Sequence, residues 1–199
     1  MTFRLHGIGA ILALSAVCAS VSASDVFQYA VAAGVNPNQQ ESTAYLWIPP
    51  DLDRIRGVVL GGNVLMEPNF VVDPAIRAAC AKAGLAIVYF SPHLDATFET
   101  EKRPCGEQLL KALADLAKAS NHPEIAEAPW VPIGHSVASL YAQRVFQWKP
   151  ERCLAVITYK GALAAAGDVP NLDRLRGVPA LHATDFMAAD PPAPAASQS

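Results

Sequence analysis

The sequence predicts an α/β protein built on a mainly parallel β-sheet with helices on both faces. Three short apolar runs, residues 57–62, 85–90 and 130–133, have the near-continuous hydrophobicity of strands buried on both faces. Segments with helical periodicity separate these runs, and alternation of strands with helices is typical of a parallel sheet. The third run leads into a sharp turn and a helix, and the candidate chemistry lies at that turn.

Size and composition are those of one globular domain. The chain has 199 residues, of which 52% are hydrophobic and 17% charged. This length is enough for a sizeable core, and the balance is not that of a disordered protein. The formal net charge is −3 and the sequence has no basic run. These features exclude nucleic acid as an expected partner.

Both ends of the chain have compositions that differ from that of a folded domain. Residues 1–23 resemble a secretory signal peptide, with Arg4 before the apolar stretch 8–21 and small residues at the cleavage site. We therefore expect a secreted or periplasmic protein. The apolar stretch is shorter than the ~20 residues that span a bilayer, so no membrane span is expected after signal removal. Residues 24–187 would form the domain, and 188–199 a disordered Pro/Ala-rich tail.

Three cysteines remain after the predicted cleavage: Cys80, Cys105 and Cys153. An exported protein can form disulfides, but an odd count leaves at least one thiol free. Apolar neighbours predict burial of Cys80 and Cys153, whereas Cys105 follows a proline and is expected at the surface. No CxxC motif or His/Cys cluster with zinc spacing occurs, so we expect neither a metal site nor a cofactor.

The first half of the chain predicts two strands before the first buried run. They are residues 26–33 and 43–48, separated by a Gly/Asn/Pro turn. Run 57–62 follows, and then a loop over 63–68. Asp73-Pro74 is a typical helix start, with aspartate as N-cap and proline in the first turn, and Gly84 is a typical stop.

The second half continues the alternation after run 85–90. A helix with leucines at helical spacing is predicted over 106–120. Two further strands are predicted over 153–159 and 178–183, with a short helix over 171–176 between them.

The stretch 128–148 contains the motif on which the functional hypothesis rests. Gly134-His135-Ser136-Val137-Ala138 joins run 130–133 to a segment with helical periodicity. This is the context of a nucleophile elbow, whose strained turn lifts a serine hydroxyl out of the sheet. Ala138 stands where the pattern has a second glycine. A small-residue turn in another kind of α/β protein is the alternative, but motif and context agree and favour the elbow.

On these residues the chain resembles the α/β-hydrolase family, over about 29–184. The resemblance implies that Ser136 is the nucleophile of acyl transfer and that the backbone N–H of Val137 donates to the oxyanion. It also implies a second donor in the loop after the third strand, where the sequence Gly-Gly-Asn-Val puts Asn63 or Val64 at the donor position. A tight turn at the strand end is the alternative role for these glycines.

The resemblance also implies an order for the other catalytic groups, with the acid after the seventh strand and the histidine after the eighth. Asp185 and Asp190 both match the position of the acid. No eighth strand is recognised in the sequence, and no histidine follows His182. The sequence therefore looks like a C-terminally truncated form of the fold in which the catalytic histidine is not identified.

The histidines in the chain differ in how well they suit the role of base. His6 lies in the predicted signal peptide, and His135 lies inside the elbow with its ring expected to point away from the serine hydroxyl. His122 is expected at the opposite edge of the sheet, and His182 within a strand. His93 follows a strand end on the correct edge. A solvated loop histidine is nevertheless the favoured interpretation of His93.

The expected activity is hydrolysis of a carboxylic ester or related acyl bond through a Ser136 acyl-enzyme. As written, the sequence is expected to be inactive or impaired because it shows no histidine after the last strand. The short connection between 159 and 178 leaves no room for a sizeable lid, which suits a small-molecule or polymeric ester substrate. The alternative is a secreted, non-catalytic domain that binds a ligand or partner through the same crevice.

Overall fold

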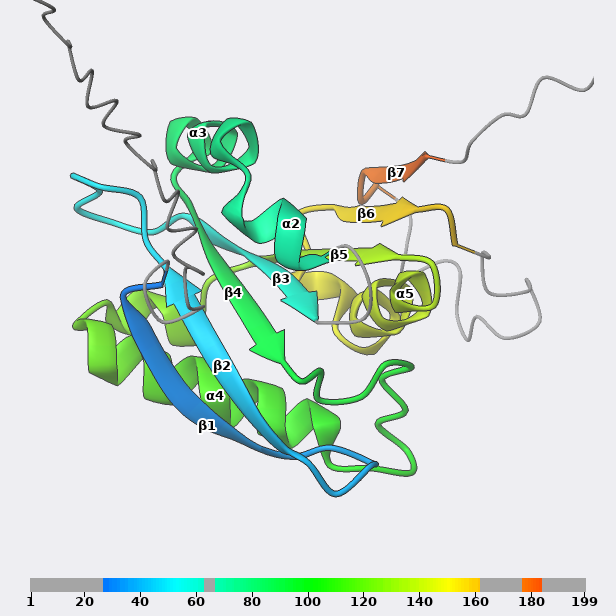
Figure 1. The fold of residues 1–199 in the computed structure, drawn as a ribbon. Coiled ribbons are helices and arrows are strands. Elements are labelled where there is room, and N and C mark those ends of the chain that lie inside the picture. Colours follow the sequence, from blue (N-terminus) through cyan, green and yellow to red (C-terminus); the bar gives the residue numbers. More distant parts are fainter. Residues whose placement is uncertain (1–26, 63–66, 162–176, 184–199) are drawn as a thin grey trace, which may run out of the picture.

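The computed structural model describes residues 27–62, 67–161 and 177–183. Seven strands form one sheet in the order β1-β2-β4-β3-β5-β6-β7 (Figure 1). The first two strands pair in antiparallel fashion and β2 also runs antiparallel to β4, whereas all later pairs are parallel. The predicted fold class is confirmed.

The strands match the predicted runs, with small shifts at their ends. Their bounds are β1 Tyr29–Val35, β2 Glu41–Trp47, β3 Gly57–Gly62, β4 Leu85–Ser91, β5 Trp130–His135, β6 Val156–Tyr159 and β7 Ala180–Ala183. The central strand β3 is buried throughout, as a strand covered on both faces must be.

Four α-helices and two short 3₁₀ turns are described. The helices are α2 Glu67–Val72, α3 Pro74–Ala83, α4 Cys105–Ser120 and α5 Ala138–Trp148, and the 3₁₀ turns are Pro123–Ala126 and Pro150–Arg152. Helix α3 begins and ends at the predicted caps. The Asp73 carboxylate accepts from the N–H groups of Ala75 and Ile76, and Gly84 is left-handed with φ 73°. Helix α2 was not predicted, because its six residues carry no cap signal.

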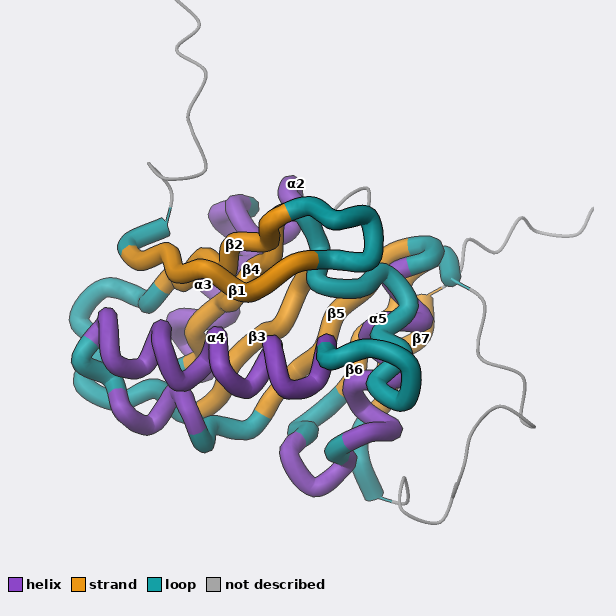
Figure 2. The backbone as a smooth tube through the Cα atoms, turned by 90° about the horizontal axis from the view of Figure 1, so that it is seen from below, coloured by secondary structure: helices purple, strands orange, loops and turns teal. Residues whose placement is uncertain are grey.

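The helices cover the two faces of the sheet unequally. Helices α4 and α5 lie on one face, and α2 and α3 lie on the other (Figures 1 and 2). The connections through α4 and α5 cross the sheet toward β7, whereas the connection through α3 crosses toward β1. Because crossovers between parallel strands are right-handed, a helix lies on one face of the sheet when the chain moves toward β7 and on the other face when it moves toward β1. This rule explains why α4 and α5 lie on the face opposite to α3.

The α3 face has no described helix over β6 and β7. Ile157 and Leu181 pair in register on this face, and their side chains are 37% and 60% exposed. Between them and α3 lies an apolar cavity of about 430 Å³, which Val131 and Cys80 help to line. Among the described residues β7 pairs only with β6, so the sheet has an open edge there.

All three cysteines of the described chain are buried and free. Burial confirms the prediction for Cys80 and Cys153. The prediction for Cys105 is wrong, because its side chain is 1% exposed at the start of α4. Pro104 is the N-cap of α4, and Cys105, the first residue of the helix, packs in the hydrophobic core, which cannot be read from the dipeptide.

Several predictions fall on residues outside the described ranges. These are the signal peptide 1–23, the short helix 171–176 and the tail 188–199. Within the described part of the chain, no helix is both long enough and apolar enough to cross a membrane.

Candidate active site

Ser136 lies at the bend between β5 and α5, and its backbone has the conformation of a nucleophile elbow. Its φ is 54°, in the left-handed region that non-glycine residues rarely adopt. The backbone N–H of Ser136 donates to the Tyr159 carbonyl on β6 at 2.9 Å, and its carbonyl accepts from the Ser139 N–H at 3.0 Å. These bonds hold the strained residue from both sides. Its side chain is exposed, as a nucleophile requires.

The bend is closely packed beneath the serine. A Cβ atom added to Gly134 would overlap the Ala138 carbonyl group, so only glycine allows β5 and α5 to approach this closely. The buried Ser139 hydroxyl donates to the Gly134 carbonyl at 3.2 Å. A Cβ atom added to Gly161, which follows β6, would overlap the Ser139 side chain. Sequence reasoning missed Ser139 and Gly161, because their roles depend on contact between segments distant in sequence.

The first oxyanion donor of the predicted site can be located. Val137 follows the serine and caps α5, so its N–H belongs to the first turn of the helix, where backbone N–H groups have no acceptor within the helix. The helix dipole adds positive potential at this end. Asn63 and Val64, the candidates for the second donor, lie outside the described residues, although Gly62 before them ends β3.

The predicted acids, Asp185 and Asp190, also lie outside the described residues. Of the histidines, His122 lies at the end of the sheet opposite to Ser136, where its Nδ1 is 3.0 Å from the Glu124 carboxylate. His135 is 6% exposed and its ring centroid lies 5.5 Å from that of Tyr159, which agrees with a packing role. The backbone of His182 lies in β7, in register with Thr158.

His93 lies just beyond the C-terminal end of β4, on the same edge as Ser136. His93 lies in a loop, as the sequence indicates, but it is only partly solvated. Its side chain is half-buried, and the Nδ1 atom is fully buried with no hydrogen-bond partner. Burial lowers the pKa of His93, and the nearby Asp95 carboxylate opposes this shift in part.

The loop that carries His93 is organised around Asp95. The carboxylate is 1% exposed and accepts from the backbone N–H and hydroxyl of Thr97, from the Glu99 N–H, and from Arg103 at 2.9 Å. Burial alone would raise the pKa of Asp95, but these hydrogen bonds outweigh it and hold the pKa below its usual value. Arg144 of α5 donates to the Thr97 carbonyl and so ties the loop to the elbow helix.

Replacing Asp95 by asparagine is therefore expected to lower the free energy of unfolding by about 2 kcal/mol at pH 7. A carboxyl group whose pKa is lower in the folded state stabilises the protein above its unfolded pKa and loses this effect as the pH falls. The difference between wild type and D95N should therefore shrink below about pH 4. Urea unfolding at several pH values measures it. The exposed Asp53 provides the control D53N, and an equal loss in both variants would contradict the assignment.

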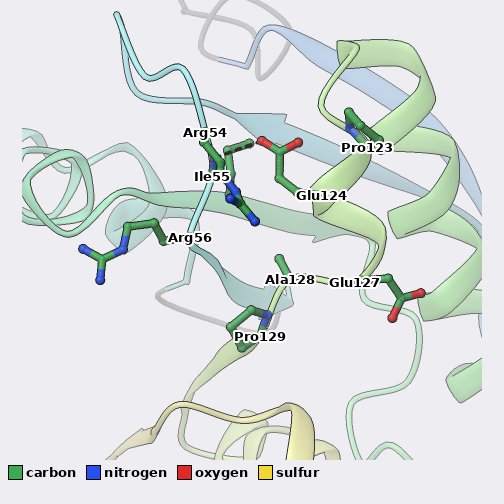
Figure 3. Close-up of a pocket in the computed structure, with 8 residues that line it drawn as sticks. All are labelled: Arg54, Ile55, Arg56, Pro123, Glu124, Glu127, Ala128 and Pro129. Carbon is green, nitrogen blue, oxygen red and sulfur yellow. Dashed lines mark hydrogen bonds between the residues drawn. The ribbon is translucent and has the colours of Figure 1, made fainter.

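A cavity of about 830 Å³ lies at the end of the sheet opposite to Ser136 (Figure 3). Arg54, Arg56 and Glu124 are among its lining residues, and the Glu124 carboxylate accepts from the Ile55 N–H at 2.9 Å. None of the lining residues is a serine, cysteine or histidine. Size therefore does not identify the candidate site, whereas the geometry at Ser136 does. Within the described ranges, no three His, Cys, Asp or Glu side chains are grouped to hold a metal ion.

Comparisons with known proteins give structural matches at low sequence identity. No family model and no curated protein matches the sequence. A thermostable esterase superposes with a TM-score of 0.53 at 17% identity, covering 79% of this chain and 46% of the esterase. Acetyl xylan esterase from Aspergillus awamori gives 0.49 at 17% identity, with coverage of 68% and 52%. Enterochelin esterase from Shigella flexneri gives 0.46 at 14%, with coverage of 76% and 44%.

The chain thus spans about half the length of each of these proteins. The TM-score of the thermostable esterase match is the one of the three that exceeds 0.5, and a likeness at 17% identity shows the fold alone. The chain has the α/β-hydrolase fold.

Proposed function

We propose that this protein hydrolyses carboxylic esters through an acyl-enzyme formed on Ser136. The observation that carries the proposal is the serine itself, exposed and held at φ 54° between β5 and α5. Such strain persists only where the surrounding structure maintains it, and it is concentrated at functional sites. Of the six non-glycine residues with positive φ in the part of the chain that the structure describes, Ser136 is the one that carries a hydroxyl nucleophile.

The reaction would use groups that the bend places side by side. The Ser136 hydroxyl oxygen would attack the ester carbonyl carbon, and the Val137 N–H would donate to the oxygen that becomes negative. The alcohol then leaves, and water hydrolyses the acyl-enzyme. The structural match to a thermostable esterase, with a TM-score of 0.53, supports an ester as the substrate class.

Burst kinetics test the acyl-enzyme. With p-nitrophenyl acetate in stopped flow, we expect a rapid release of p-nitrophenol stoichiometric with enzyme, followed by slower turnover. The S136A variant should show no burst. A non-catalytic binding domain, the alternative function, would give the same trace for both proteins, and that result would rule out acylation of Ser136.

A further inference from the structure

The strand next to the elbow is followed by a lysine, and this residue bears on which esters the proposed site accepts. We propose that Lys160 selects esters that also carry a carboxylate, because its ammonium group binds that carboxylate beside Ser136. The inference rests on the proposed function and adds a substrate class to it.

Lys160 lies between two residues that contact the backbone of Ser136. Before it, the Tyr159 carbonyl accepts from the Ser136 N–H at 2.9 Å. After it, a Cβ atom added to Gly161 would lie 2.7 Å from the Ser136 carbonyl oxygen. His135 pairs with Tyr159 in the register of β5 and β6, and the next residues of these strands are the serine and the lysine. Their backbones are therefore roughly one strand separation, 4.8 Å, apart.

The backbone of Lys160 has the same unusual conformation as that of Ser136. The φ angles of the two residues are 49° and 54°. Among the non-glycine residues with positive φ in the described ranges, these two directly follow neighbouring parallel strands. Strain of this kind persists only where the surrounding structure maintains it, and it is concentrated at functional sites. The conformation fixes the point at which the lysine side chain leaves the backbone relative to the serine.

The side chain of Lys160 places its ammonium over a neighbouring aromatic ring. The Nζ atom lies 5.4 Å from the centroid of the Tyr159 ring. This ring in turn lies 5.5 Å from that of His135, the residue before the serine. An ammonium has three N–H donors, so contact with a ring leaves donors for a carboxylate. Lys160 is exposed, so a substrate can reach it.

The buried and partly buried carboxylates of the loop after β4 have cations of their own. Asp95 pairs with Arg103 at 2.9 Å, and Glu99 pairs with Arg144 at 3.2 Å. The positive charge of Lys160 should therefore act on a substrate at this edge of the sheet. A charge at the surface attracts an anion most strongly at low ionic strength, because salt screens the interaction.

The test compares anionic with neutral esters of similar size in wild type, K160M and K160R. Mono-p-nitrophenyl glutarate, with its carboxylate on the acyl side, is compared with p-nitrophenyl butyrate. The second pair is 4-acetoxybenzoate, with its carboxylate on the alcohol side, and 4-acetoxybenzamide. For at least one pair, K160M should lower the ratio of anionic to neutral kcat/KM about 10-fold, mainly through KM, whereas K160R should retain it. The affected pair shows on which side of the ester the carboxylate lies.

Lys149 provides the matched control, because its Nζ also lies over an aromatic ring, at 5.0 Å from Trp148, but at the far end of α5. K149M should leave both ratios unchanged. Raising the salt concentration from about 20 to about 300 mM should lower the wild-type ratio and leave that of K160M almost constant. Thermal unfolding checks that each variant is folded.

The outcomes separate this inference from the proposed function. If K160M changes the anionic and neutral esters equally, or changes neither, the inference is overturned while the proposed function stands. If K160R loses the preference as completely as K160M, the side chain acts through its shape rather than its charge, and the inference is also overturned. If wild type hydrolyses none of the four esters, both fail.

Discussion

Replacing Gly134 by alanine is expected to lower the free energy of unfolding by about 3 kcal/mol and to slow labelling of Ser136 about 100-fold. The new methyl group would overlap the Ala138 carbonyl, which belongs to the backbone of α5 and cannot rotate away. Relief requires α5 to move from β5, and this movement distorts the bend that carries both Ser136 and the Val137 N–H. Chemical unfolding and labelling rates measure the two effects.

Gly61 provides the control for this prediction. It lies in β3 next to β5, but an added Cβ would lie 3.5 Å from the Ile133 side chain, an ordinary contact. G61A should therefore change stability by less than about 1 kcal/mol. Equal losses in G61A and G134A would mean that the close approach of β5 and α5 has no special role.

Replacing Ser136 by glycine is expected to abolish ester hydrolysis, by about 10⁴-fold or more, and at the same time to stabilise the protein. Glycine adopts φ 54° without steric cost, so the free energy of unfolding should rise by about 1 kcal/mol. Alanine removes the hydroxyl but keeps the strain, so S136A should be equally inactive and no more stable than wild type. Thermal unfolding and an activated-ester assay on the three proteins check both effects.

The S136G and S136A variants separate the effect of backbone strain at residue 136 from the effect of losing the hydroxyl group. If S136G is less stable than wild type, the serine side chain contributes to folding and the bend is not strained. Residual hydrolysis in both variants would place the nucleophile elsewhere.

The main features of the fold could be predicted because hydrophobic periodicity and turn residues determine them locally. The run 57–62 became β3 with the same bounds, and Asp73 and Gly84 delimited α3. The strand order was not predicted, because it depends on pairing between segments that are distant in sequence. Helix α2 was missed because six residues carry too little periodicity to register.

The candidate site was only partly predictable. Ser136 and Val137 share a contiguous motif, so their positions follow from local sequence. The burial of His93 does not, because His93 packs against Gly62 and the neighbouring Pro92 is held by Ser42, and both contacts form only when the sheet is assembled. A histidine between a proline and a leucine in a polar loop therefore has the sequence pattern of a solvated residue.

The most direct test of the account is to locate the adduct after a fluorophosphonate probe reacts with the wild-type protein. Proteolysis and mass spectrometry should find the added mass on Ser136 alone, and S136A should remain unmodified under the same conditions. An unlabelled wild-type protein, or an adduct on another serine, would contradict the claim that the bend between β5 and α5 presents an activated nucleophile.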